Sequence, residues 1–421
     1  MESTRLDEVV PRGMVSVEAR GFQPYESIHI TAPDLNTASK ILGKETREQV
    51  STLINEKRNE KDFEDRLKNA SDSLRRLQML SVAYSEKFTT PDEINHLENY
   101  LGALENFAIG AGISINESAL MQIEDQVGCQ TLVVQNTESG EVAAIHTEED
   151  ADEYARSKNP KWGKRWVDMT VGNRKIQFCS YPGICSFGSA SGISEQNGKT
   201  YFQAVDVIGQ TVKGDLWANS VAFMFMDAGN IEFAEKMADN LKTLPKPIFQ
   251  GGYIVHAVEG AKAPRIATFE FGGNTIESVP PEKSVDKKGD INRLIQIGVN
   301  YPRSKDLQAI DEYNSPRSSE ESEDEYQERI AERKIMERRI RRLIKIGQLV
   351  GKKFKLDLSE WGENNVLKVA TRVMKNKHGD WLDDWFSGLA NDLVAQNDTL
   401  YVSSKGEMKL IVRKGYPKLR K

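Results

Sequence analysis

Residues 128–150 read GCQTLVVQNTESGEVAAIHTEED, and this stretch decides the expected fold. Within it, residues 131–134 have the alternating pattern of a strand and lead into a polar turn at residues 136–140. An apolar run at residues 142–145 follows the turn. Two short apolar runs joined by a glycine-containing turn are typical of a β-hairpin. We therefore predict a β-hairpin here, with Cys129 at the start of its first strand.

The sequence changes character on either side of this hairpin. Before it, residues 32–120 are mostly helical in pattern and highly charged. After it, residues 217–241 have the apolar spacing of a helix, and several strands are predicted around them. The predicted strands are residues 175–180, 201–208, 252–258 and 265–271. We therefore expect an α+β fold with a strand-rich middle and helices before, within and after it.

These changes of pattern predict three parts. They are a helical N-terminal segment at residues 1–128 (a propeptide if the chain is processed), a core at residues 129–350, and a small C-terminal extension at residues 351–421. Residues 326–349 predict a long helix rich in Arg and Lys. In the C-terminal extension, residues 399–403 and 408–413 have the pattern of a terminal hairpin.

The composition is that of a globular protein with a polar surface, because 38% of the residues are hydrophobic and 29% are charged. A net charge of −6 gives no global reason to expect a nucleic acid or a membrane surface as partner. No stretch approaches the roughly 20 apolar residues of a membrane helix, and the N-terminus has no apolar signal-peptide core. The three cysteines show no CxxC spacing. We therefore expect a cytoplasmic protein. The sequence leaves open whether it forms a homo-oligomer.

Several familiar motifs are incomplete. The five histidines are scattered and form no HExxH or Cys/His pattern, so neither a metal nor a cofactor is expected. Gly188-Ser-Ala-Ser-Gly192 has Ala190 where a nucleophile elbow has serine. The basic helix around Arg338 could contact phosphates, but acidic residues one turn away favour a solvated face. Nucleic-acid binding is therefore a third hypothesis.

Cys129 decides the functional interpretation. On the residues alone, a cysteine at the edge of a strand is usually a small buried hydrophobic residue. However, Gly128-Cys129-Gln-Thr-Leu-Val-Val, a glycine turn and Ala144-Ile-His-Thr-Glu-Glu-Asp150 together resemble the opening of the acyl-coenzyme A:6-aminopenicillanic acid acyltransferase family. That family and the related bile salt hydrolases are N-terminal-nucleophile (Ntn) hydrolases. The resemblance implies a four-layer αββα sandwich with two antiparallel sheets.

The resemblance continues over about residues 113–349. Tyr181-Pro-Gly183 is similar to the Tyr-Pro-Gly segment of the family, and GISEQNG at residues 192–198 is similar to its Gly-Ile-Asn-Glu-x-Gly turn. Ile266-Ala-Thr-Phe-Glu270 resembles a strand that ends near a glutamate, and Gln296-Ile-Gly-Val-Asn300-Tyr301 resembles an Ala-Asn-His-Phe element. The order and spacing of these segments carry the resemblance.

The resemblance also implies roles for the matching residues. Cys129 is the expected nucleophile, freed by cleavage between Gly128 and Cys129, and Glu149 is expected to hold the amine or the cysteine in place. Asn300 is the expected oxyanion donor. A basic residue of the late helix, Arg338 or Arg339, is expected to orient the carboxylate, with Arg339 in the catalytic set. The substrate-binding positions are His146, Tyr181 and Asp206.

Four positions depart from the family pattern, one of them Tyr301, which stands where the Asn-His pair of the family has histidine. Thr147 replaces the usual Asn of the short motif, and Glu149 stands where the family has Asp. Asp206 falls where relatives place an Asn in the oxyanion region, and an ionised acid cannot donate a hydrogen bond there. The other two cysteines, Cys179 and Cys185, are interpreted as structural.

A cysteine at a new N-terminus carries its own base. Its α-amine has a reference pKa of about 7.7–8.0, so it can accept the thiol proton near neutral pH. The thiolate would attack an amide or acyl carbonyl of a small-molecule substrate and form an acyl-enzyme. If water then takes the acyl group, the protein is a hydrolase, and if an amine takes it, the protein is an acyltransferase. The main alternative is an uncut, catalytically inactive Ntn-fold protein that acts as a binding module.

Overall fold

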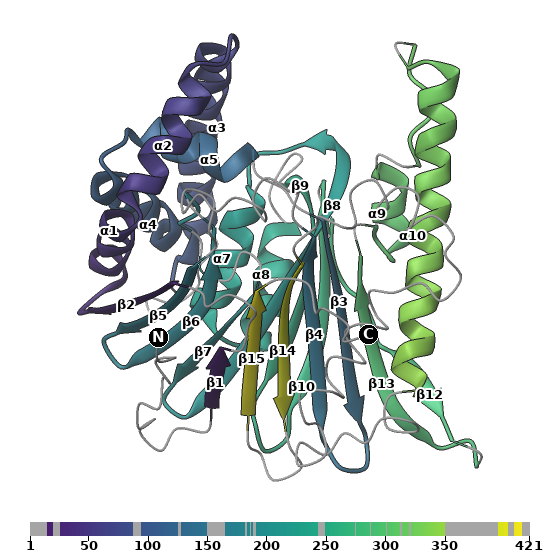
Figure 1. The fold of residues 1–421 in the computed structure, drawn as a ribbon. Coiled ribbons are helices and arrows are strands. Elements are labelled where there is room, and N and C mark those ends of the chain that lie inside the picture. Colours follow the sequence, from purple (N-terminus) through teal and green to yellow (C-terminus); the bar gives the residue numbers. More distant parts are fainter. Residues whose placement is uncertain are drawn as a thin grey trace, which may run out of the picture.

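The structure is a computed structural model. It describes residues 15–19, 26–86, 94–124, 128–149, 165–181, 183–185, 187, 191–242, 249–273, 275–286, 288–299, 301–311, 314–319, 321–349, 395–402 and 408–414. Figure 1 shows two stacked β-sheets, with the long helix α10 on one side and a group of helices on the other.

The first sheet has seven strands in the order β1-β15-β14-β4-β3-β13-β12. Neighbouring strands are antiparallel except β1 and β15, which are parallel. The strands are β1 (Val15–Ala19), β15 (Met408–Lys414), β14 (Ala395–Val402), β4 (Val142–Glu149), β3 (Gly128–Asn136), β13 (Ile291–Gly298) and β12 (Glu282–Val285).

The second sheet has eight strands in the order β11-β10-β9-β8-β7-β6-β5-β2. It is antiparallel except for the edge pair β2 and β5. The strands are β11 (Thr275–Ser278), β10 (Arg265–Gly272), β9 (Gln250–Glu259), β8 (Lys199–Lys213), β7 (Ser191–Gln196), β6 (Arg174–Ser180), β5 (Arg165–Val171) and β2 (Glu26–Ala32).

Helices cover the outer face of each sheet. On the seven-stranded sheet, α10 buries Met336 and Leu343 against apolar residues of β3, β4 and β13. On the eight-stranded sheet, α7 and α8 lie over the strands, and α4 and α5 pack against α7. The helices are α1 (Leu35–Glu45), α2 (Arg47–Arg58), α3 (Phe63–Ser85), α4 (His96–Ala111), α5 (Ile115–Glu124), α7 (Ala218–Ala228), α8 (Ile231–Lys242), α9 (Lys305–Ile310) and α10 (Glu323–Leu349).

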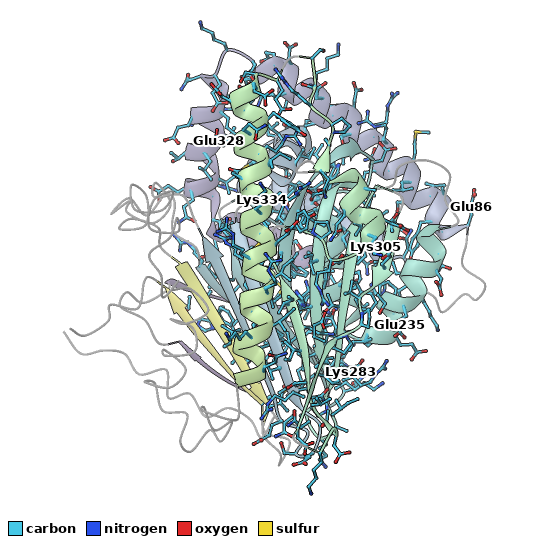
Figure 2. All side chains as sticks on the ribbon, turned by 90° about the vertical axis from the view of Figure 1, so that its right-hand side faces the viewer. Glu86, Glu235, Lys283, Lys305, Glu328 and Lys334 are labelled. Carbon is cyan, nitrogen blue, oxygen red and sulfur yellow. The ribbon has the colours of Figure 1, made fainter. Side chains whose placement is uncertain are left out.

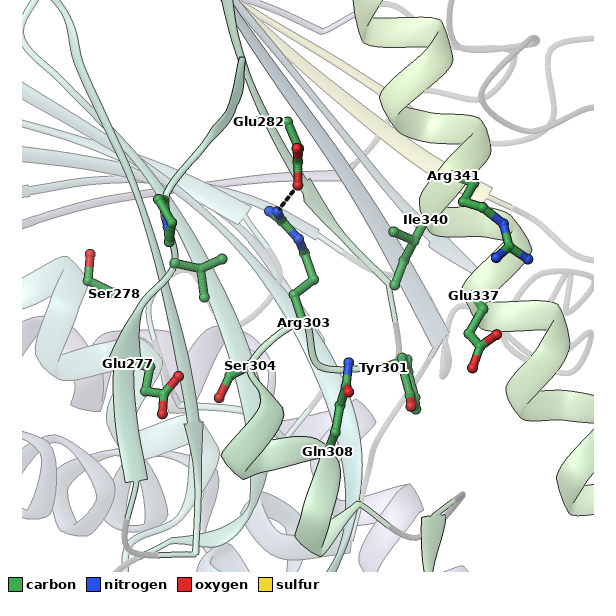
Figure 3. A pocket seen from close by; sticks show the side chains of 12 residues that line it. Glu277, Ser278, Glu282, Tyr301, Arg303, Ser304, Gln308, Glu337, Ile340 and Arg341 are labelled. Carbon is green, nitrogen blue, oxygen red and sulfur yellow. Dashed lines mark hydrogen bonds and ion pairs between the residues drawn. The ribbon is translucent and has the colours of Figure 1, made fainter. Parts of the chain in front are cut away.

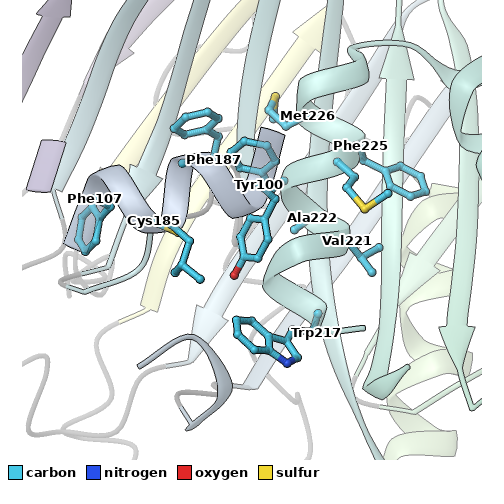
Figure 4. Close-up of a cluster of buried hydrophobic side chains, with 14 of the residues drawn as sticks. Tyr100, Phe107, Cys185, Phe187, Trp217, Val221, Ala222, Phe225 and Met226 are labelled. Atoms are coloured by element: carbon cyan, nitrogen blue, oxygen red, sulfur yellow. The ribbon is translucent and has the colours of Figure 1, made fainter. Parts of the chain in front are cut away.

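The described residues therefore form helix, sheet, sheet and helix layers with a core in each gap. Between the sheets, Val133 and Ala144 meet Phe202 and Val258. Beneath α7, aromatic residues dominate the largest core, in which the rings of Tyr100 and Trp217 meet edge to face (Figure 4). Because burying apolar surface is the main favourable contribution to folding, these cores hold the layers together.

The hairpin predicted around the turn at residues 136–140 is confirmed, since β3 and β4 are antiparallel with Leu132 opposite Ile145. The Asn136 side chain accepts the N–H groups of Glu138 and Ser139, and Gly140 has a φ of 72°. An asparagine that bonds to the backbone ahead of it, followed by a glycine, is the chemistry of a tight turn.

The single helix predicted at residues 217–241 is two helices, α7 and α8. Gly229 separates them with a φ of 65°, and its N–H donates to Phe225 O at 3.0 Å. A glycine in the left-handed conformation is a common helix end, and it overrides the apolar periodicity that continues past it.

Three further expectations about the fold need correction. The sheets are not wholly antiparallel, because β1 and β2 each add a parallel edge strand. The N-terminal segment is not only helical, because those two strands come from it. The C-terminal hairpin is present but is not a peripheral extension: β14 pairs with β4, so the hairpin lies inside the seven-stranded sheet (Figure 1). Strand partners so distant in the sequence leave no local signal.

Candidate functional site

Cys129 lies between the two sheets. It is the second residue of β3 and is only 1% exposed. The N–H of Val207, on β8 of the other sheet, donates to Cys129 Sγ at 3.4 Å. Side chains alternate between faces along a strand, so Thr131 and Val133 share this inner face, and Val133 belongs to the core between the sheets. The predicted nucleophile thus faces the interior of the sandwich.

A buried polar cluster continues from this point along the same face. Thr131 pairs with His146 across β3 and β4, and Thr131 Oγ1 lies 2.9 Å from His146 Nδ1. His146 Nδ1 is 4.0 Å from Asp206 Oδ1, and both side chains are fully buried. The structure therefore brings together two of the three predicted substrate-binding residues.

The cluster extends to residues that the sequence did not single out. His256 Nε2 lies 3.2 Å from Asp206 Oδ2, and His256 Nδ1 lies 2.9 Å from Thr268 Oγ1. When the side-chain amide of Gln296 is oriented so that both its oxygen and its nitrogen form hydrogen bonds, the nitrogen donates to Thr268 Oγ1 at 3.0 Å. We name Thr131, His146, Asp206, His256, Thr268 and Gln296 the inter-sheet cluster.

Burial controls the charge of His256. Burial lowers the pKa of this imidazole, the neighbouring Asp206 carboxylate opposes the shift, and burial dominates. The charge of Arg303, close by, lowers the pKa further. His256 is therefore neutral near pH 7. The carboxylate favours the hydrogen on Nε2, which leaves Nδ1 to accept from the Thr268 hydroxyl.

Gly298 makes room for the Asp206–His256 pair. A Cβ at this position would lie 2.0 Å from Asp206 Oδ2 and 2.3 Å from His256 Nε2. No side chain larger than hydrogen fits there unless the pair moves. Gly298 ends β13, and a glycine within a strand can mark such a close approach.

Two more ionisable groups lie around the cluster. Burial raises the pKa of Tyr253, which pairs with Val207 across β8 and β9, and the nearby charge of Cys129 adds to the shift. Glu270 is fully buried and accepts the backbone N–H groups of Arg303 and Ser304 at 2.7–3.0 Å. Burial raises the pKa of Glu270, and the two N–H donors oppose that shift.

The residues predicted to support the nucleophile do not belong to the inter-sheet cluster. In the strand register, Glu149 is opposite Gly128, whereas Glu148 is opposite Cys129. Arg339 is buried on α10, where its Nη1 contacts Met336 Sδ at 3.9 Å, on the helix side of the seven-stranded sheet. Asn300 lies outside the described residues.

The remaining predicted residues belong to the eight-stranded sheet and its cores. Tyr181 is half-buried in the turn after β6, where its carbonyl accepts the N–H of Ile184. Cys179 is buried in the core between the sheets, and Cys185 lies in the core under α7 (Figure 4). Burial raises the pKa of the Cys185 thiol. Both surroundings suit structural cysteines.

A second buried histidine–carboxylate pair lies elsewhere, between α4, α7 and β6. Asp227 Oδ2 is 2.5 Å from His96 Nδ1 and accepts Asn99 Nδ2 at 2.8 Å, while Asp227 Oδ1 accepts Arg174 Nη1 at 2.8 Å. Burial would raise the pKa of Asp227, but the hydrogen bond to His96 and the charges of His96 and Arg174 outweigh it and lower the pKa to about 2.

A pocket of about 520 Å³ opens between β11, β12, α9 and α10 (Figure 3). Its lining includes Glu277, Tyr301 and Arg303, but not Cys129. Its volume is within the usual range for small-molecule sites.

Among the described residues, no three His, Cys, Asp or Glu side chains are arranged to hold a metal ion. None of the described helices has the length and apolar character needed to cross a membrane. Comparison of the chain with protein-family models and with curated protein sequences finds no match.

Proposed function

We propose that this protein is a cysteine hydrolase of the Ntn type that acts on a small-molecule amide, with Cys129 as the nucleophile. The observation that carries the proposal is the position of the thiol, buried at the start of an inner strand and accepting the N–H of Val207 at 3.4 Å. A hydrogen bond from an N–H group stabilises a thiolate more than a thiol. The two stacked sheets between helices are consistent with the fold that the sequence resemblance implies.

Activation follows from cleavage of the Gly128–Cys129 bond. Water adds across this peptide bond, which leaves a carboxylate on Gly128 and a free α-amine on Cys129. The amine accepts the thiol proton, and the thiolate attacks the substrate carbonyl. The amide C–N bond then breaks, the amine product leaves with a proton, and water hydrolyses the thioester. An amine in place of this water makes the reaction an acyl transfer.

The cleaved pieces are expected to stay together. The piece that ends at Gly128 contains β1 and β2, which pair with β15 and β5 of the other piece. Its helices also contribute Leu42, Leu104 and Phe107 to the largest core. We therefore expect denaturing gels to show two bands where native mass analysis shows one species.

Intact mass and N-terminal sequencing test the cleavage. Freshly purified wild-type protein should convert to a species that begins at Cys129, and Cys129→Ala should remain whole. Cys185→Ala is the matched control, because it removes a different buried thiol, and it should be cleaved like wild type. A wild-type chain that stays whole through long incubation contradicts self-processing.

Acyl trapping tests the nucleophile separately. Incubation with p-nitrophenyl acetate should add one acetyl group to Cys129, located by peptide mapping, and Cys129→Ala should not gain it. Iodoacetamide at neutral pH should modify Cys129 before Cys179 and Cys185. Preferential modification of Cys185 would overturn the assignment.

The supporting carboxylate can be identified by comparing Glu149 with its neighbour. Glu149→Gln should slow processing or turnover by about tenfold, with little change in melting temperature. Glu148→Gln is the matched variant, since Glu148 is opposite Cys129 in the register. A larger loss in Glu148→Gln than in Glu149→Gln moves the supporting role to Glu148.

A second candidate function is an uncut Ntn-fold protein that acts as a binding module. The observation that favours it is the strand pairing, because β3 includes Gly128 and pairs it with Glu149 across the proposed cleavage site. A whole chain that acquires no acetyl group at Cys129 would favour this function.

A further inference from the structure

The outer face of α10 carries a stripe of exposed basic side chains. We name Lys334, Arg338, Arg341 and Lys345 the basic stripe. Steps of four, three and four residues place them on one face of the helix, over a length of about 16 Å. The opposite face of α10 packs on the seven-stranded sheet, in front of which the helix lies in Figure 2. The basic stripe therefore faces away from the protein.

This part of the chain is basic although the protein as a whole is acidic. Residues 333–355 contain ten Lys or Arg and one acid, Glu337, in a chain with a net charge of −6. Glu337 is four residues from Arg341, but its ion-pair contact is with Arg333, at 3.8 Å. The other ion pairs of α10 among the described residues involve Glu323 and Arg329. The acidic residues one turn away therefore do not neutralise the basic stripe.

The spacing within the basic stripe opposes helix formation. Lys334 and Arg338 are like charges four residues apart, and so are Arg341 and Lys345. Such pairs destabilise a helix, so the stability of α10 does not explain the pattern. A polyanion bound along the stripe would replace this repulsion with attraction.

The surroundings of the basic stripe favour the backbone of a nucleic acid duplex. Residues 333–348 contain no aromatic residue, so the stripe has no side chain on which an unpaired base could stack. A membrane-binding helix needs an apolar face free to enter the lipid. Here the described apolar side chains, Met336, Ile340, Leu343 and Ile344, pack on the sheet. A duplex presents one phosphate about every 3.4 Å on each strand, so a stripe of about 16 Å passes about five phosphates.

We propose that the basic stripe binds the phosphate backbone of double-stranded DNA without reading its base sequence. The guanidinium groups of Arg338 and Arg341 bind phosphate oxygens, and a lysine at each end adds a point charge. Acidic residues in the first turn of α10 repel phosphate and limit the contact to the C-terminal half of the helix. Cys129 lies between the sheets, so the proposal is independent of the proposed hydrolase activity.

Fluorescence anisotropy with the full-length protein and a short labelled DNA duplex tests the proposal. The duplex should bind with a Kd of about 1–100 μM at physiological salt, the usual range for contacts to the backbone alone. A plot of log affinity against log salt concentration should have a slope of about −3.6, the value for four phosphate contacts. A single strand of the same length should bind more weakly, because its bases find no aromatic partner.

Variants assign the contacts. The double variant Arg338→Gln/Arg341→Gln should weaken duplex binding at least about tenfold and make the salt slope shallower by about 2. Glu337→Gln removes the one acid beside the basic stripe, so it should strengthen binding about twofold. The matched control is Lys68→Gln/Arg75→Gln, which removes two exposed charges from one face of α3 and should bind like wild type. Melting curves check that each variant is folded.

Three results would overturn the proposal. They are the absence of duplex binding to wild type at low salt, unchanged duplex binding in the folded double variant, and tighter binding of the single strand than of the duplex. Phosphatidylserine vesicles are the competing probe, and binding to them without binding to the duplex would assign the stripe to a membrane surface. Cys129→Ala should bind the duplex like wild type, so failure of the proposed hydrolase would leave DNA binding intact.

Discussion

The protein buries two histidine–carboxylate pairs, and the pairs differ in how the carboxylate is satisfied. Asp227 accepts hydrogen bonds from Arg174 and Asn99 and lies 2.5 Å from His96. Asp206 forms no hydrogen bond of good geometry with the described residues, and its ionisable neighbours are two histidines, with a ring nitrogen of each at 3.2 and 4.0 Å from its carboxylate oxygens. A fully bonded carboxylate stabilises a fold, whereas a poorly satisfied one is costly and is typical of functional sites.

The positions of the two pairs support this distinction. The Asp227 pair joins α4 to α7 and β6, so it ties the N-terminal helices to the eight-stranded sheet. The Asp206 pair lies between the sheets, in the same gap as the Cys129 thiol. We therefore expect changes at Asp227 to affect stability and changes at Asp206 to affect chemistry.

The largest effect is expected from closing the space beside the Asp206 pair. Gly298→Ala places a Cβ 2.0 Å from Asp206 Oδ2, so it should lower the free energy of unfolding by about 3 kcal/mol. Urea unfolding measures the loss. Gly140→Ala is the control, since a Cβ at residue 140 meets nothing within 4 Å. The positive φ of this residue alone opposes the substitution, and it should lower the free energy of unfolding by about 1 kcal/mol. Equal losses in the two variants would show that crowding at Gly298 is unimportant.

An effect of similar size is expected from breaking the bonded pair. Asp227→Asn removes the charge that His96 and Arg174 contact, and it should cost about 3 kcal/mol, because it leaves Arg174 buried and uncompensated. Chemical denaturation at neutral pH is the measurement. A loss below about 1 kcal/mol would mean that the pair does not hold α4 in place.

Acid should weaken the two pairs in separate pH ranges. The pKa of Asp227 is lowered to about 2 in the folded protein, so its stabilisation is present above the ordinary pKa of 3.8 and is lost as the pH falls toward 2. This loss amounts to about 2 kcal/mol. His256 has a lowered pKa, so the folded state resists its protonation, and stability should decline as the pH falls below 6.5.

Unfolding free energies measured from pH 8 to pH 2 check both ranges. His256→Gln should remove the decline that begins below pH 6.5, and Asp227→Asn should remove the decline below pH 3.8. If both variants retain both declines, other groups titrate in their place.

The smallest change in stability is expected for Asp206→Asn. Asparagine has nearly the same shape, it removes a buried charge that lacks hydrogen-bond donors among the described residues, and its amide oxygen still faces His256. The free energy of unfolding should change by less than about 1 kcal/mol. Acetylation at Cys129 should nevertheless slow. A loss as large as that of Asp227→Asn would make the two pairs structurally equivalent.

Local patterns in the sequence were enough to predict several elements. The turn residues Asn136 and Gly140 specify the β3–β4 hairpin, and the helix rich in Arg and Lys predicted at residues 326–349 is α10. The position of Cys129 at the start of a strand also followed from sequence, because the change from helical to strand pattern occurs there. Each of these features depends on residues within a few positions of one another, so each leaves a local signal.

The tertiary structure alone decided which distant residues meet. The C-terminal hairpin lies inside the seven-stranded sheet, and β1 and β2 join the sheets at their edges. The inter-sheet cluster takes side chains from six strands. The spacing of its residues in the sequence does not predict that His256 lies beside Asp206 or that Gly298 leaves room for both. The physical reason is that strand order and sheet stacking depend on the burial of whole faces, a non-directional force that leaves no motif in the residues it brings together.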